Sequence, residues 1–406
     1  MTLPSDATGA SVGPAIGTLP EAVVEPAAAG GPPPSIWPPV TRPVLIARIV
    51  IGVALSVAVL YAPFYFPPET NRVLSQALYI AIAAMGLNLL TGFNGQVSIG
   101  HGAFFGVGAF TSAILMVDHG WTFEATIPVA AALTGVVGML VGFPALRVRG
   151  LYLALVTLGM AVLFPRVASK YVEGSGGVAL LRPARGEFAS LIEPLDDDQW
   201  AYFVCLVFTV VLFVLAWNLV RGRMGRAMVA VRDQEIAAAT VGVNLAGTKV
   251  GTFALSAVYA GVAGSLSVMV NRIADGTNPI LYFQLSIEFL VAMVIGGAAT
   301  ILGPAVGAFL LVLLRRNTED LIEGKEILAP AIFGAALIAI VYVLPEGIVG
   351  GVRRLLARLG RRSTRAATPG ASGPPGAPAA PAAPPPESGR QTDDSTNRGG
   401  SDDEGT

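Results

Sequence analysis

The sequence predicts an all-α polytopic membrane protein with about ten transmembrane helices, within a range of about eight to ten, and disordered terminal tails. Hydrophobic residues make up 53% of the 406 positions and charged residues only 13%, whereas about 25% of the residues in soluble domains are charged. Apolar runs recur along the chain at the length that crosses a bilayer, about 20 residues in a helix. Composition and pattern therefore predict the same class.

Three parts of the chain differ in composition. Residues 1–42 are rich in Ala, Pro and Gly, and residues 351–406 are first basic and then rich in Pro and Ala. Both segments bury too little apolar surface to fold alone, so we expect disordered tails, the second of them cytoplasmic. Residues 43–350 form the predicted transmembrane domain. The single cysteine, Cys205, excludes a disulfide within the chain.

Each apolar run gives one predicted span. In chain order the spans are 44–66, 73–90, 97–117, 125–141, 151–168, 200–220, 250–270 and 327–349. The run 285–314 would span roughly 45 Å as a single helix, which is too long for one crossing. Gly296-Gly297 and Gly303-Pro304 in its middle predict two short helices joined by a turn.

The positions of the arginines predict on which side of the membrane each loop lies, since cytoplasmic loops carry an excess of Arg and Lys. Arg147 and Arg149, the arginines of 221–232 and those of the C-terminal tail share one side only if 285–314 crosses twice. Both termini are then cytoplasmic. Arg315 and Arg316 fall outside and are the exceptions to this scheme, with Glu319 and Asp320 beside them.

The glycine-rich segment 87–110 is the first candidate for a transport pathway. Its polar side chains are Asn88, Asn94, Gln96, Ser98 and His101. Glycine weakens a helix, so the segment can break and expose backbone N–H groups that would suit a carboxylate. The alternative is a face of small residues on which neighbouring helices pack closely.

Glu288 is the second candidate for the pathway. An ionisable side chain within a span is costly in lipid and commonly faces the protein interior or water. Because Glu288 lies about one turn from the predicted border, an interfacial position is the alternative. We also consider a pairing of Glu288 with His101 across the bundle.

The polar segment 221–249, here called the coupling segment, is too charged to enter lipid. Helical spacing of Met224, Met228 and Val231 predicts an amphipathic helix over 224–241, with Gly242 where it stops. Its charged residues are Arg226, Arg232, Asp233 and Glu235. The apolar face could lie on lipid, on its own bundle or in a groove of a partner protein. The residues alone do not separate these three explanations.

The chain lacks the residues that several kinds of functional site need. The chain has no Gly-x4-Gly-Lys-Ser/Thr sequence, so we expect no ATP site of that type. With only His101 and His119, and no metal-ligand spacing, we expect neither a catalytic triad nor a metal centre. The arginines cluster at membrane borders, so topology accounts for them and we expect no nucleic-acid binding.

The segment 87–110 and three further stretches resemble the permease subunits of branched-chain amino acid ABC importers, the LivM type. They read LNLLTGFNGQVSIGHGAFFGVGAF, ALRVRGLYLALVTLGMA, GRAMVAVRDQEIAAATVGVN and VAMVIGGAATILGPAVGAFLL. The resemblance implies a subunit of the bacterial plasma membrane that pairs with a second related permease, two cytoplasmic ATPase subunits and an extracytoplasmic solute-binding protein. It binds no cofactor itself, and its partners use ATP.

The resemblance also identifies the coupling segment with the helix that docks into the ATPase, the EAA motif. Ala237, Ala238 and Gly242 fit that motif, whereas Ile236 replaces its usual Glu. Related permeases transport urea and short amides, which is the first alternative function. The second is an ion-coupled secondary transporter with Glu288 as its ion site, and the third is a membrane scaffold.

Overall fold

The computed structural model describes residues 57–146, 150–171, 195–278 and 280–320, with Ala54, 180–181 and a few residues between 334 and 354. The chain divides before Pro68 into two compact units, and each is described by itself. In the first unit, residues 57–65 are helical, within the predicted span 44–66. The rest of that span, most of 327–349, Arg147, Arg149 and nearly all of both predicted tails lie outside the described residues.

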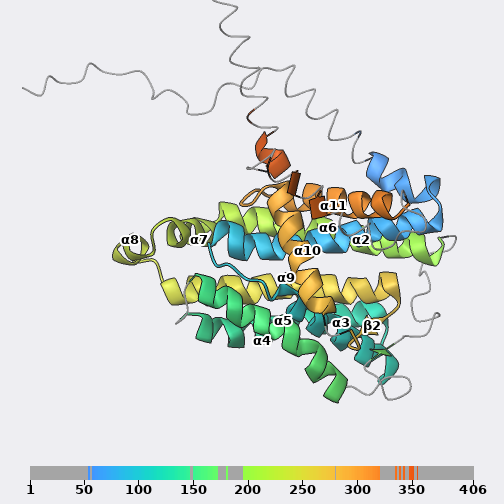
Figure 1. Ribbon diagram of the computed structural model, residues 1–406, viewed down its shortest axis with the longest axis horizontal. Helices are drawn as coiled ribbons and strands as arrows, with labels where there is room; N and C mark the ends of the chain where they lie inside the picture. The colour runs from blue at the N-terminus through green and yellow to red at the C-terminus, as the bar shows by residue number, and fades with distance from the viewer. Residues whose placement is uncertain are drawn as a thin grey trace, which may run out of the picture. The chain divides into compact units, whose positions relative to one another are not determined.

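The second unit is built from helices (Figure 1). In chain order they are α2 (Pro68–Leu87), the π-helix η1 (Asn88–Phe93), α3 (His101–Val117), α4 (Phe123–Ala145), α5 (Leu151–Tyr171), α6 (Asp197–Arg221), α7 (Arg223–Asp233), α8 (Glu235–Thr240), α9 (Leu245–Asn271), α10 (Leu281–Gly296) and α11 (Gly303–Asp320). Two-residue strands, β1 (Leu180–Leu181) and β2 (Ala274–Asp275), pair antiparallel.

Among the residues that the structure describes, four stretches are long and apolar enough to cross a membrane: Pro68–Phe93, Phe123–Ala145, Asp197–Arg221 and Leu245–Asn271. Helices α3 and α10 and the part Tyr152–Ala168 of α5 are apolar but shorter. The predicted all-helical membrane class is confirmed for the part of the chain that the structure describes. The number of about ten crossings stays a prediction.

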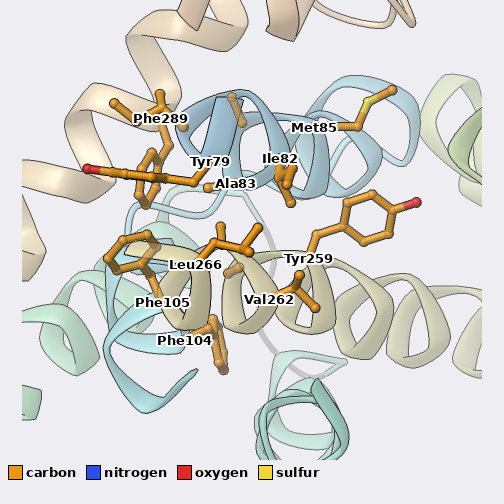
Figure 2. Close-up of a cluster of buried hydrophobic side chains, with 14 of the residues drawn as sticks. Tyr79, Ile82, Ala83, Met85, Phe104, Phe105, Tyr259, Val262, Leu266 and Phe289 are labelled. Carbon is orange, nitrogen blue, oxygen red and sulfur yellow. The ribbon is translucent and has the colours of Figure 1, made fainter. Parts of the chain in front are cut away.

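Helix α9 is the centre of this unit and lies between α2 on one side and α3 and α4 on the other (Figure 1). In their most apolar windows, 83% of the α9 residues and 78% of the α2–η1 residues are buried, against 28% in α6. Aromatic and aliphatic side chains from α2, α3, α9 and α10 meet in one cluster around α9 (Figure 2). The peripheral helices keep one apolar face for lipid or a partner subunit.

Small residues allow α9 to approach its neighbours closely. A Cβ atom added to Gly264 would lie 1.9 Å from the carbonyl oxygen of Phe105 on α3, well inside van der Waals contact. Gly102 on α3 is equally close to the backbone of Tyr282 on α10. The interpretation of the segment 87–110 as a face of small residues for close packing therefore holds for residues 101–110, which belong to α3.

Gly264→Ala should destabilise the fold, because overpacking a close helix contact typically costs about 1–3 kcal/mol. The matched control is Gly159→Ala on α5, where an added Cβ meets no atom within 4 Å. Alanine is the better helix former by about 1 kcal/mol, so the control should be neutral or stabilising. Thermal unfolding of the purified chain in detergent measures both. An equal unfolding temperature for the two variants would contradict the close contact.

The run 285–314 is two helices joined by a turn, as the Gly-Gly and Gly-Pro pairs predict. Helix α10 ends at Gly296, residues 297–302 turn, and α11 begins at Gly303. Ala299 in this turn has a φ of 57°, a conformation that costs energy for a residue with a side chain. Its N–H donates to Asn88 Oδ1 at 2.8 Å, so a contact with η1 stabilises the turn.

Ion pairs gather at one end of the bundle. Helices α7 and α8 lie at one end, called here the α8 end, and β2 lies at the other, the β2 end (Figure 1). At the β2 end, Asp196 forms a capping box at the start of α6. The neighbouring Asp198 accepts from Arg72 at 3.2 Å, and Asp197 accepts from Arg272 at 3.4 Å.

Arg315 and Arg316, the exceptions to the predicted sidedness, are bound in the same way. Arg315 pairs with Glu288 at 2.9 Å, and Arg316 donates to the Thr70 hydroxyl at 3.3 Å. Both arginines therefore have a partner on a neighbouring helix of the bundle. The orientation of the two ends in the membrane stays a prediction.

Candidate functional site

The coupling segment folds as two short helices instead of the single predicted one. Helix α7 ends at Asp233, Gln234 is extended with φ −155° and ψ 96°, and α8 begins at Glu235. The Gln234 carbonyl then accepts the N–H of Ala238, which starts the new helix. Gly242 follows α8 with a φ of 85°, as expected of the residue that stops a helix.

The predicted docking face of this segment is wrong. Met228 is fully buried and Val231 is 5% exposed, because α7 packs against α6, α9 and η1. Met224 is half-buried, with its Cε atom against Gly251 of α9. The apolar face of α7 thus belongs to its own bundle, the second of the three explanations.

The exposed apolar side chains of the segment are instead Ile236 on α8 and Val241 just after it, at 76% and 78% exposure. Helical spacing does not predict these two residues, because the spaced apolar positions Met224, Met228 and Val231 all lie on α7. The available signal was a pair of β-branched apolar residues within an otherwise small and polar stretch.

Arg232 is an exposed residue, and its guanidinium also contacts η1 of its own bundle. Its Nη1 donates to the carbonyl oxygen of Gly92 in η1 at 3.0 Å, and its guanidinium also pairs with Asp233 at 2.9 Å. Glu235 pairs with Lys249 of α9, and both side chains are largely shielded from solvent. Arg226 stays exposed, and its side chain donates to the Arg221 carbonyl. Two polar contacts therefore fasten α7 and α8 to η1 and α9.

A cavity of about 190 Å³ lies behind these contacts. Its walls include Asn94, Gln96, Arg232, Glu235 and Lys249. Asn94 is 2% exposed, and neither amide atom has a hydrogen-bond partner among the described residues. Two of the predicted pathway residues, Asn94 and Gln96, are thus brought together with the coupling segment.

Asn88, Ser98 and His101 are fully buried and line neither this cavity nor the larger one described next. Asn88 Nδ2 donates to the Thr300 carbonyl at 2.8 Å, while its Oδ1 accepts from Ala299. His101 packs edge-on against Phe104 and Phe289, and neither its ring nitrogens nor Ser98 Oγ have a hydrogen-bond partner among the described residues. Asn88 therefore joins η1 to the α10–α11 turn, and His101 packs between α3 and α10.

The predicted helix break in the segment 87–110 is present, because residues 94–100 are not helical. The start of α3 does not offer its N–H groups to a pathway, however. The N–H of Gly102 donates to Ser286 Oγ of α10 at 2.8 Å. A side chain therefore occupies the position expected for a carboxylate.

Glu288 lines a larger cavity, of about 450 Å³, at the β2 end. It pairs with Arg315 of α11, so the considered pairing with His101 is wrong. The antiparallel hairpin of α10 and α11 brings the carboxylate and the guanidinium together. Among the described residues, no group of three or more His, Cys, Asp or Glu is placed to hold a metal ion.

Residues 69–341 match the family described as branched-chain amino acid transport system / permease component. The chain is 28% identical to the high-affinity branched-chain amino acid transport system permease protein LivM of Escherichia coli K12, over 75% of this chain and 74% of that protein. It is 25% identical to LivH of the same strain and 26% identical to BraD of Pseudomonas aeruginosa. Each of these alignments covers 66% of this chain and 91% of the relative. No solved structure matches.

Proposed function

The chain belongs to the family of permease components of branched-chain amino acid transport systems, and we propose that it forms part of the translocation pathway of an ATP-driven importer for these amino acids. The family match over 69–341 carries this conclusion, because it includes the core helices, the coupling segment and the α10–α11 hairpin. The chain is a multi-pass membrane protein and a transport subunit.

The partners follow from the same membership. Escherichia coli K12 has two related permease proteins of this system, LivM and LivH, and the chain is similar to both. A second related permease therefore completes the pathway, two ATPase subunits bind on the cytoplasmic side, and an extracytoplasmic protein delivers the substrate. The α8 end faces the cytoplasm of a bacterial cell, both termini are cytoplasmic, and about ten helices cross the membrane.

Helix α8 is the part that docks on an ATPase subunit. Its exposed Ile236 and the following Val241 supply an apolar surface of the kind that inserts into a groove on a partner. Arg226 and Asp233 lie exposed beside it and can add polar contacts at the rim. Met228 and Val231 on the buried face of α7 pack against the bundle, so a movement of α8 is transmitted through α7 to the bundle.

The contacts behind α8 give that movement a route. Arg232 binds Gly92 in η1, and Asn88 in the same η1 binds the turn between α10 and α11. π-Helical turns frequently mark functional sites within helices. Closure of the ATPase dimer would displace α8, shift η1 and move the α10–α11 turn, so that access alternates between the two sides.

Reconstitution tests the function. Proteoliposomes that contain this chain, the related permease and the ATPase subunits should take up L-leucine when supplied with the solute-binding protein and ATP. Uptake should stop without ATP or with an inactive ATPase. Uptake by this chain alone, driven by an ion gradient, would show a secondary transporter, and preferred uptake of urea or a short amide would assign that substrate instead.

A further inference from the structure

The large cavity at the β2 end has the size and the lining of a binding site. Its volume of about 450 Å³ falls within the range of about 300–1,000 Å³ that is typical of small-molecule sites. Helices α2, α3, α9, α10 and α11 and the segment around β2 all contribute to its wall. Its lining includes Ala274 and Asp275 of β2, and β2 lies at the opposite end of the bundle from α8 (Figure 1).

One wall of the cavity is charged. Glu288 Oε1 accepts from Arg315 Nη1 at 2.9 Å, and both side chains line the cavity. The Glu288 side chain is 11% exposed and that of Arg315 is 41% exposed, so the guanidinium is the more accessible partner. Asp275 adds a second carboxylate, whose Oδ1 accepts from the backbone and hydroxyl of Thr277.

Other lining residues are apolar or aromatic: Tyr79, Phe105 and Ala109, together with Leu281 and Leu285, which precede Glu288 on α10. The rings of Tyr79 and Phe105 lie 6.0 Å apart between centroids, and Figure 2 shows them at the edge of the aromatic cluster formed with Phe289. An aliphatic side chain placed here would contact carbon atoms on several sides, as in other apolar pockets.

We propose that this cavity binds a branched-chain amino acid as a zwitterion, with its carboxylate on Arg315, its ammonium group on Glu288 and its side chain against Phe105 and Leu285. The proposal rests on the proposed transport function and adds a substrate site within the membrane subunit itself.

The charge pair makes the site selective for a zwitterion. A ligand with both charges can separate Glu288 from Arg315 and still leave each of them with a partner of opposite charge. A ligand with a single charge can replace the contact of only one of the two groups, and an uncharged ligand can replace neither, so these ligands do not restore the electrostatic energy lost when the pair separates. Arginine also binds a carboxylate through two parallel N–H groups, which fixes the orientation of the ligand.

Cysteine protection in the full chain tests this site. Gln284 lines the cavity and is exposed, whereas the single native cysteine, Cys205, is fully buried, so the variant Gln284→Cys carries the one accessible thiol. In lipid nanodiscs, L-leucine should slow its reaction with a maleimide several-fold. His119→Cys, exposed after α3 and away from the cavity, should react at an unchanged rate.

Two compounds and two further substitutions sharpen the test. 4-Methylpentanoate, which lacks the ammonium group, and 3-methylbutylamine, which lacks the carboxylate, should not protect. Added to Gln284→Cys, Glu288→Gln should raise the leucine concentration for half-protection about tenfold or more, as expected for loss of a charged hydrogen bond. Arg72→Gln, which breaks a similarly exposed ion pair at the same end, should leave it unchanged.

Absence of protection by leucine, equal protection by the singly charged compounds, or an equal effect of Arg72→Gln would overturn the proposal. Leucine uptake by the wild-type assembled transporter separates this failure from that of the proposed function. Normal ATP-driven uptake without protection would contradict only the proposed substrate site. Absence of uptake would contradict the proposed transport function.

Discussion

Replacing both Ile236 and Val241 with aspartate should lower ATP-driven leucine uptake by at least about a hundredfold, while the chain still inserts and folds. Both side chains are more than three-quarters exposed, so the change costs the isolated chain little. Burying an aliphatic side chain at an interface contributes about 1.5–3 kcal/mol, and each 1.4 kcal/mol is a factor of ten in affinity. Co-purification of the ATPase subunits with the tagged chain measures the loss directly.

The conservative pair Ile236→Leu and Val241→Leu is the control, and it should retain uptake within a few-fold because the apolar surface remains. Met228→Asp should behave differently from both. Met228 lies on the inner face of α7 and is fully buried, and a buried carboxylate without a partner costs several kcal/mol. We expect a lower yield of folded chain. Normal uptake in the double aspartate variant would show that α8 is not the docking element.

The sequence predicts some features of the coupling segment and not others. Charge excludes the segment from lipid, and helical spacing marks Met224, Met228 and Val231 as one apolar face. Spacing does not tell whether that face meets its own bundle or another protein. Gln234 gives no warning of the break before α8 either, since neither Gly nor Pro stands there. The direction of each side chain depends on that break.

The membrane helices were more predictable, because hydrophobicity acts over whole segments. The division of 285–314 followed from its glycines and Pro304, and the structure confirms it. The pairing of Glu288 with Arg315 follows from the same hairpin, since an antiparallel turn brings residues before and after it side by side. This signal was missed when His101 was considered instead. The roles of Asn88 and Arg232 depend on long-range contacts that no local pattern encodes.

Asn88→Leu should uncouple ATP hydrolysis from transport, because it removes both side-chain hydrogen bonds between η1 and the α10–α11 turn. The substitution keeps similar volume but leaves the Ala299 N–H and the Thr300 carbonyl without their partner. Each lost bond of this kind costs about 1–3 kcal/mol, so the turn with its strained Ala299 should relax or shift. We expect leucine transported per ATP hydrolysed to fall about tenfold or more in proteoliposomes, with hydrolysis retained.

Arg232→Gln should give a weaker version of the same defect, because it removes the contact between α7 and Gly92 and an exposed ion pair with Asp233 but leaves both Asn88 hydrogen bonds in place. If the two contacts act in series, the double variant should be little worse than Asn88→Leu alone. Effects that multiply would instead indicate independent roles, since distant sites without a shared element are usually additive in free energy. A connected route needs such measured coupling and not only adjacency in space. Non-additivity here would identify η1 as the element through which α8 acts on the α10–α11 hairpin.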